Sequence, residues 1–413
     1  MRGIAAFAVV LSHAADNVAA SDQTAAQILQ SLCATPLRAM FNGRYAVIFF
    51  FVLSGWVLTR SLLVEKPPGY LVFVLRRIMR LCVPTAAALI LSAALYWACH
   101  STSPWPDPTV WFANAGWTRV PWPSEIIRQA LMIGADGDFY LDGVVWSLVH
   151  ELRFSLLLPL VVLVSARGTT MSAATMLLAS GAMLFGIQLS ETEPQLVSIA
   201  NIVLPLVILC VVVLRTEMHR AWSVSTGTLA FLACCVLAGV LIGRQMGNHE
   251  RVMLGRDEWE SLLATFYFLP TFLIGAALAV GALDRFVLRP NHRYLCLGCA
   301  LLLLCYDNLF AIVGASVLLI RLAQQPSGLQ TLLRTGFLVF LGRISFSLYL
   351  VHVPVYLALG HTLHDVLPKG AIVALGIVLS VPSAWILYRV AEHPAQRFAR
   401  RIQLEMPVKF AGR

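Results

Sequence analysis

The residues best suited to chemistry stand at the start of the chain, in the apolar stretch MRGIAAFAVVLSH. Arg2 and His13 are eleven positions apart within it. An α-helix turns about 100° per residue, so the two side chains fall within roughly 20° of the same face and about 16 Å apart along the axis. Ionisable groups at membrane depth are costly and usually face a bundle interior, where they do chemistry or move ions. We therefore expect the functional centre at this pair.

A second candidate is the arginine cluster in FVLRRIMRL. Arg77 and Arg80 are three positions apart, so they share one helix face. Guanidinium groups at the mouth of a span suit a phosphorylated ligand that arrives from the cytosol. The same cluster would also arise as a simple positive-inside anchor of the helix. The sequence leaves both interpretations open.

Two further apolar segments carry polar side chains, which are costly to bury and therefore indicate a structural or functional role. In WSLVHELRF, Glu151 lies within an apolar helix and is either one partner of an ion pair or a proton carrier. In FLGRISFSLYLVH, Ser345, Tyr349 and His352 follow an i, i+4, i+7 pattern and project from one stripe, and Arg343 precedes them. Both segments are candidates for a site inside a helical bundle.

The elements that must position these groups are membrane-spanning helices. The chain is 59% hydrophobic and 12% charged, whereas soluble domains are about 25% charged. Stretches long enough to cross a bilayer recur throughout, so we predict an all-α, polytopic transmembrane bundle of about 10–12 spans. The apolar segments lie near residues 3–15, 44–63, 77–99, 144–164, 171–189, 196–214, 226–243, 261–283, 294–306, 309–322, 337–358 and 370–390.

Loop charges predict the orientation of the bundle. Lysine and arginine are about twice as frequent in the loops on the side of both termini, which predicts cytoplasmic ends. This bias also accounts for the net charge of +9, so we expect membrane lipids and not nucleic acid as partners. We expect a helix-ending turn at Pro394 and divide the chain into a transmembrane domain, 1–395, and a basic cytoplasmic tail, 396–413. Residues 294–322 would form two tilted spans or a re-entrant hairpin.

The longest loop, about 100–143, is rich in aromatic residues. Its tryptophans are Trp105, Trp111, Trp117 and Trp122. They are expected to anchor the protein at the headgroup boundary or, alternatively, to offer a flat surface to a sugar. The loop aspartates, expected to be solvated, are Asp136, Asp138 and Asp142. The sequence contains no zinc-ligand spacing, Gly-rich phosphate loop or nucleophile elbow, and we expect no metal site.

Taken together, these motifs resemble a known family. The strings are R-x10-H from Arg2 to His13, FFFVLSGW at 49–56, RRIMR at 76–80, WSLVHE at 146–151, LGRISFSLYLVH at 341–352 and EHP at 392–394. In this order they are similar to the acyltransferase-3 family of bacterial integral-membrane O-acyltransferases, which modify surface and exported carbohydrates. The resemblance extends over nearly the whole chain and includes no appended hydrolase-like domain.

The resemblance implies a reaction and roles for the residues. The catalytic residues would be His13, Arg2 and Glu151. The residues at the substrate or donor would be Arg77, Arg80, Arg343, Ser345, Tyr349 and His352. The protein would use no bound cofactor. It would move an acyl group, expected to be acetyl, from cytosolic acyl-CoA to a hydroxyl of a carbohydrate or lipid-linked glycan, at the bacterial inner membrane.

The chain departs from the family pattern at two places. Leu152 and Ser155 stand where an acidic residue and a tyrosine often follow the WSL motif. The first apolar run, at about thirteen residues, is short for a span, so we expect the native protein to begin upstream of Met1. Alternatively, residues 18–20 imitate a signal-peptide cleavage site, and cleavage there would remove the Arg2–His13 pair. A transporter or flippase of lipid-linked sugars is the competing function.

Overall fold

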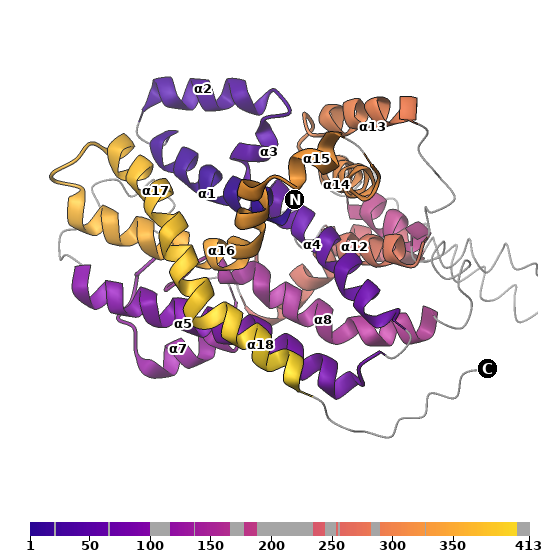
Figure 1. Ribbon diagram of the computed structural model, residues 1–413, viewed down its shortest axis with the longest axis horizontal. Coiled ribbons are helices and arrows are strands. Elements are labelled where there is room, and N and C mark those ends of the chain that lie inside the picture. Colours follow the sequence, from indigo (N-terminus) through magenta and orange to yellow (C-terminus); the bar gives the residue numbers. More distant parts are fainter. Residues whose placement is uncertain are drawn as a thin grey trace, which may run out of the picture.

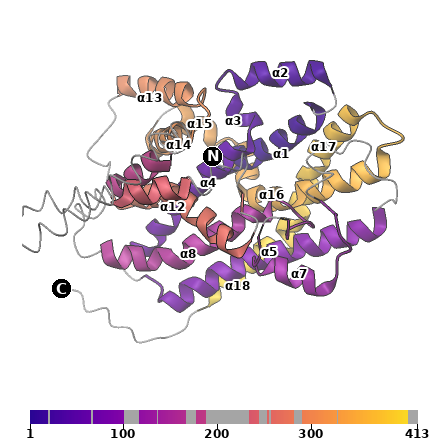
Figure 2. The ribbon, with the colours of Figure 1, turned by 180° about the vertical axis from the view of Figure 1, so that it is seen from behind.

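The computed structural model of the chain describes residues 1–19, 22–64, 67–99, 116–135, 137–165, 177–187, 234–243, 253–254, 257–281, 290–326 and 328–402. Every regular element among these residues is a helix, as an all-α bundle requires. Figures 1 and 2 both show α2 and α13 along one edge and α5, α8 and α18 along the opposite edge, with α16 between them.

Five of the described helices are long and apolar enough to cross a membrane. They are α4 (Gly43–Leu62), α5 (Tyr70–Cys99), α12 (Glu258–Ala279), α16 (Gly336–Leu363) and the continuous helix Lys369–Arg401, which contains α17 (Lys369–Leu387), η1 (Tyr388–Glu392) and α18 (His393–Arg401). The chain is therefore a multi-pass α-helical membrane protein, as its composition predicts.

The other predicted segments have different outcomes. Segment 3–15 forms α1 (Arg2–Ala19), and segment 144–164 forms α8 (Val145–Ser165). Residues 177–187 of segment 171–189 and residues 234–243 of segment 226–243 are described and helical, whereas segment 196–214 lies outside the described residues. The expected total of about 10–12 spans stays a prediction.

The shorter helices lie at the edges of the bundle. They are α2 (Gln23–Cys33), α3 (Arg38–Phe41), α7 (Pro123–Ala130), α13 (Pro290–Leu303), α14 (Leu309–Gln324) and α15 (Gly328–Leu333). Helices α13 and α14 pack against each other as a hairpin. Asn308 caps α14, since its side chain accepts a hydrogen bond from the backbone N–H of Ala311 at 2.7 Å. Arg38 holds the connecting turn by donating to the carbonyl of Cys305 at 3.2 Å.

Helix α16 is the central element, since it packs against α17, α1 and α5. The register between α1 and α16 depends on a close approach at Gly3. A Cβ atom at Gly3 would lie 2.5 Å from the backbone nitrogen of Gly342, so only glycine lets the two backbones meet there. Small residues at helix contacts are the usual means of close packing in membranes. This contact fixes which residues of α1 face which residues of α16.

The last span continues through Pro394, where the sequence favours a helix-ending turn. Residues Tyr388–Glu392 form a π-helix, and the N–H of His393 bonds to the carbonyl of Tyr388. The wider turn accommodates the proline ring, which would otherwise clash with the preceding turn. Helix α18 then extends to Arg401. The expectation of a helix end at Pro394 is therefore wrong.

The described part of the long loop is more buried than predicted. Trp117 is 3% exposed, and its indole N–H donates to Ser92 Oγ at 2.9 Å. Asp142 is fully buried, and Asp138 pairs with Arg128, so neither carboxylate is a freely solvated loop charge. Trp122 is 64% exposed and remains compatible with an anchor. The loop residues Trp105, Trp111 and Asp136 lie outside the described residues.

Candidate active site

Two imidazoles from opposite ends of the sequence meet inside the bundle. His13 on α1 and His352 on α16 approach with 3.0 Å between Nδ1 of His13 and Nε2 of His352. The rings are stacked, with centroids 5.2 Å apart and planes inclined by 22°. His352 is fully buried. The register set at Gly3 therefore brings together the two histidines that the motifs single out.

The hydrogen-bond partners assign the tautomers of this pair. His352 Nδ1 lies 3.1 Å from the carbonyl oxygen of Leu348, and because a carbonyl only accepts, the proton of neutral His352 sits on Nδ1. Its Nε2 is then an acceptor, so His13 Nδ1 donates to it. Neutral His13 consequently carries its lone pair on Nε2. That nitrogen is the one able to take a proton from a substrate.

The start of α4 bounds the space beside His13. The backbone N–H of Gly43 donates to Ser12 Oγ at 2.8 Å, which ties α4 to α1. A Cβ atom at Gly43 would lie 4.0 Å from His13 Nε2. The glycine at the start of α4 therefore lies close to the basic nitrogen.

Of the other candidate residues on α16, one lies near the histidine pair and two do not. The hydroxyl of Tyr349 lies 2.7 Å from Ser147 Oγ and donates to the carbonyl of Val144 at 3.0 Å, which joins α16 to the start of α8. Its ring centroid is 6.1 Å from that of His352. Ser345 is buried and donates to Gly342 of its own helix at 3.0 Å. Arg343 is exposed. The structure thus brings Tyr349 to the histidine pair but leaves Ser345 and Arg343 apart from it.

Glu151 forms a buried ion pair. Its Oε1 accepts from Arg77 at 2.8 Å and from Ser54 Oγ at 3.2 Å. The side chains of Arg77 and Glu151 are 9% and 15% exposed. Ser155, which stands where the family pattern has a tyrosine, accepts from Arg77 Nε at 3.1 Å. Of the two roles that the sequence leaves open for Glu151, the structure shows the ion-pair partner.

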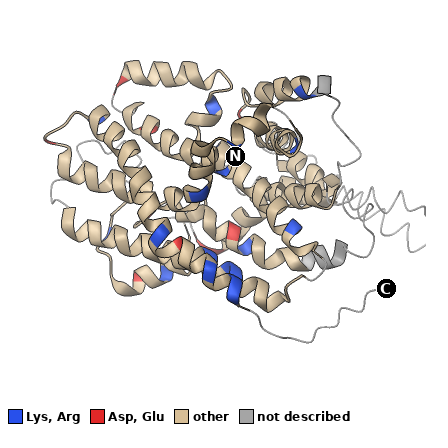
Figure 3. Cartoon of the chain, in the orientation of Figure 1, with Lys and Arg blue, Asp and Glu red and all other residues tan. Residues whose placement is uncertain are grey.

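A basic cavity of about 320 Å³ opens beside this ion pair. It is lined by Leu58, Ser61, Val64, Pro68, Phe73, Arg76, Arg77, Arg80, Gln396, Ala399 and Arg400. Four of these residues are arginines, contributed by α5 and α18. Figure 3 shows blue segments gathered along α18, in a ribbon that is otherwise mostly tan. The guanidinium of Arg76 also donates to the carbonyl of Ile402 at 3.0 Å. The cavity is suited to an anion with several charges.

A second carboxylate lies in the same region. Glu392, in the π-helix, is 4% exposed and accepts from the backbone N–H and the hydroxyl of Ser347 at 3.1 and 2.6 Å. Gln396 donates to its other oxygen at 2.9 Å. The charge of Arg2 acts on both Glu151 and Glu392. Arg2 therefore belongs to the charged end of the bundle and not to the histidine pair.

Comparison with known proteins identifies the chain at the level of a family. Residues 1–389 match the acyltransferase-3 family model, described as an acyltransferase domain. The chain belongs to the acyltransferase-3 family. It is a membrane acyltransferase, as the order of its motifs predicts. None of the curated proteins and none of the solved structures matches it.

Sequence reasoning missed several residues at or near the candidate site of this acyltransferase. Glu392 stood in the EHP motif, yet nothing in its spacing indicated a bond to Ser347. Arg400 was assigned to a tail because the helix was expected to end at Pro394. Arg76 belongs to the RRIMR string, but helical spacing paired only its neighbours Arg77 and Arg80. Each of these contacts depends on how distant helices pack.

Proposed function

We propose that this acyltransferase moves an acyl group, expected to be acetyl, from acyl-CoA to a hydroxyl of a surface or exported carbohydrate. The observation that carries the proposal is the 3.0 Å contact between His13 Nδ1 and His352 Nε2, from which we assign the Nδ1 proton of His13 to this bond and a lone pair to its Nε2. Acyl transfer to an alcohol needs such a base, and imidazole titrates near neutral pH. His352 orients the base, as the third member of a catalytic triad does.

The reaction follows from this arrangement. His13 Nε2 takes the hydroxyl proton while the oxygen attacks the carbonyl carbon of the thioester. The tetrahedral intermediate then collapses, the carbon–sulfur bond breaks, and the CoA thiolate leaves. The thiolate receives the proton from His13, which returns to its neutral form. Each turnover yields one ester and one CoA thiol, and no cofactor is required.

The basic cavity is where we place the donor. Arg80 and Arg400 offer guanidinium groups to the phosphates of CoA, and Arg77 lines the same cavity while paired with Glu151. Arg2 adds its charge at this end, about 16 Å along α1 from His13. One end of α1 would thus hold the donor's phosphates while the acyl end reaches the histidine. On this view the donor enters from the cytosol, with the protein in the bacterial inner membrane.

The test is the ester content of the surface polysaccharide in bacteria that carry the wild-type protein or a variant. We expect wild-type protein to add base-labile acyl groups and His13→Gln to lower the transfer rate by about 10²- to 10⁴-fold. His364→Gln is the matched control, because His364 follows the last residue of α16 and its two ring nitrogens contact the carbonyl of Gly360 and the carboxylate of Asp365, not the His13–His352 pair.

Two results would contradict the proposal. If His13→Gln kept wild-type activity at an equal protein level, His13 could not be the base. If the wild-type protein moved glycan across the membrane without forming any ester, the competing function of a transporter would be favoured. Acetyl-CoA binding to purified His13→Gln should equal that of the wild type, since the base does not line the donor cavity.

A further inference from the structure

A second, much smaller cavity lies on the opposite side of the histidine pair. It is lined by Asn17, Tyr356, Lys369, Ile372 and Val373, from α1, α16 and α17. Asn17 follows His13 by four residues, and Tyr356 follows His352 by four, so each polar group lies one turn, about 6 Å, beyond an imidazole. The cavity therefore lies one turn beyond the histidine pair along α1 and α16, on the side away from the arginine-lined cavity.

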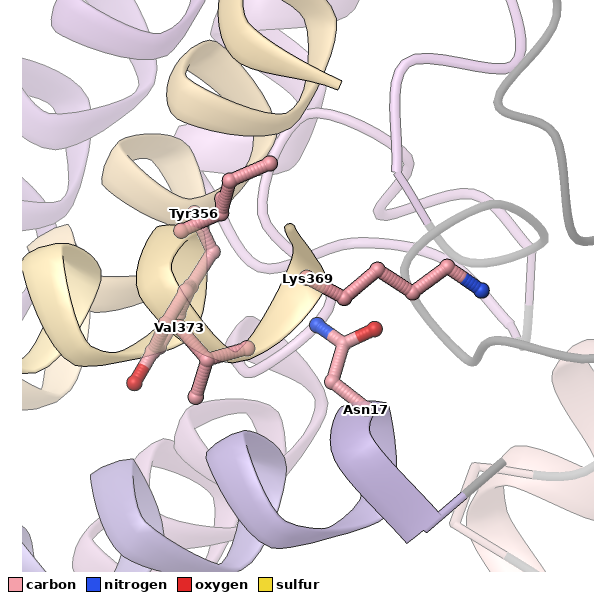
Figure 4. A pocket seen from close by; sticks show the side chains of 5 residues that line it. Asn17, Tyr356, Lys369 and Val373 are labelled. Carbon is pink, nitrogen blue, oxygen red and sulfur yellow. The ribbon is translucent and has the colours of Figure 1, made fainter. Parts of the chain in front are cut away.

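Asn17 is an unusual residue for this place. It is 5% exposed, and its amide forms no hydrogen bond with any residue that the structure describes. A buried amide without a partner is destabilising, since it has lost its bonds to water. Figure 4 shows this amide beside the side chain of Lys369, at the start of α17. An amide that faces a cavity in this way is available to a ligand.

The size and chemistry of the cavity restrict that ligand. Its volume is about 10 Å³, enough for one water-sized group. An amide both donates and accepts hydrogen bonds, as a hydroxyl does, whereas an anion would need donors only. The ammonium of Lys369 adds a donor at the same lining. A single hydroxyl group therefore fits better than a phosphate or a carboxylate.

We propose that Asn17 and Lys369 form an acceptor subsite, which binds one hydroxyl of the carbohydrate while a neighbouring hydroxyl is presented to His13. This inference rests on the proposed function and adds to it the residues that orient the acceptor. The subsite favours acceptors with at least two hydroxyls about one helical turn apart. Asn17 is here a binding residue, because no proton is transferred at its amide.

The experiment separates acceptor binding from donor binding. Purified full-length protein in phospholipid vesicles receives labelled acetyl-CoA and, as acceptor, envelope polysaccharide whose esters have been removed with base. Initial rates are measured with each substrate varied in turn. Asn17→Leu keeps the branched shape of the side chain but removes the amide, Asn17→Ser keeps a group that donates and accepts, and Lys369→Met removes the ammonium.

We expect Asn17→Leu and Lys369→Met to raise the KM for polysaccharide by about threefold to tenfold, the loss for one hydrogen bond. The KM for acetyl-CoA and the kcat should stay unchanged, and Asn17→Ser should recover part of the loss. An unchanged polysaccharide KM in Asn17→Leu, or an equal rise for both substrates, would overturn the subsite. Failure of the wild type to acylate polysaccharide at all would instead overturn the proposed function, and the subsite with it.

Discussion

The two ends of α1 lie in opposite chemical surroundings. Near Arg2 the bundle holds four further arginines, two buried carboxylates and a cavity of about 320 Å³. Near His13 and Asn17 it holds imidazoles, an amide, the single ammonium of Lys369 and a cavity of about 10 Å³. A large cationic cavity suits a soluble polyanion. A small, less charged one suits a hydroxyl group and a proton.

Two carboxylates that precede or belong to α8 also differ in their surroundings. Glu151 is buried against Arg77 at 2.8 Å, whereas no cation among the described residues pairs with the fully buried Asp142 at the start of α8. A buried charge is stable when it is paired and hydrogen-bonded, and otherwise the group tends to become neutral. The protein therefore keeps a paired charge where the donor is placed, whereas the carboxyl of Asp142 has no such partner among the described residues.

Breaking the Arg77–Glu151 ion pair should have the largest effect on stability. Glu151→Gln or Arg77→Met leaves one buried charge without its partner, which costs about 3–5 kcal/mol. The double variant should recover much of this loss, because no charge then remains unpaired. The free energy of unfolding in detergent measures each change. Single variants as stable as the wild type would mean that the charged end does not depend on this pair.

A substitution at the contact between α1 and α16 should have the second-largest effect on stability. Gly3→Ala places a Cβ atom 2.5 Å from the backbone of Gly342 and should destabilise the protein by about 1–3 kcal/mol through overpacking. Gly342→Ala is the control from the same contact, because a Cβ atom there meets nothing within 4 Å. Thermal unfolding compares the two variants, and acyl transfer should fall in Gly3→Ala alone. Equal behaviour of the two would contradict the register described here.

The donor cavity can be tested by charge removal. Arg80→Gln and Arg400→Gln should each weaken acetyl-CoA binding by about tenfold, or about 1.4 kcal/mol, and reduce its dependence on salt. Arg60→Gln removes the same charge from an exposed position outside the cavity lining and should leave binding unchanged. Titration calorimetry provides the measurement. A similar loss in all three variants would indicate a general field effect and no specific site.

The smallest expected effect is a pH dependence at Asp142. Burial raises the pKa of its carboxyl well above the ordinary value. The folded state then binds a proton more tightly than the unfolded state, so the contribution to stability is present at low pH and is lost as the pH rises toward the folded pKa. Asp142→Asn, which resembles the protonated acid, should stabilise the protein at neutral pH by about 1 kcal/mol and not at pH 4. Equal shifts at both pH values would argue against this titration.

Much of the architecture could be predicted from local patterns. The helices at 44–63, 261–283 and 337–358 follow from apolar length, and the spacing of Arg2 and His13 places them on one helix. The motif order indicated that His352 belongs to the site. The contact between His13 and His352 could not be derived in this way, because it joins residues 339 positions apart through a register set at Gly3.

The errors have physical causes of the same kind. The family resemblance implied that Arg343 lies at the substrate or donor, but local patterns could not say which face of α16 meets its neighbours, and Arg343 is exposed. Loop composition suggested a solvated Asp142, whereas tertiary packing buries it. Local rules describe a helix well and describe its partners poorly.

The π-helix at Tyr388–Glu392 has a consequence for the whole final span. A π turn holds one more residue than an α turn, so the helix emerges from it rotated by roughly 100° relative to an uninterrupted α-helix. That phase shift turns Gln396 and Arg400 toward the cavity, although the residues of α17 before it pack on α16. One extra residue thus allows one continuous helix to pack against the bundle with the residues before the π-helix and to line the cavity with the residues after it.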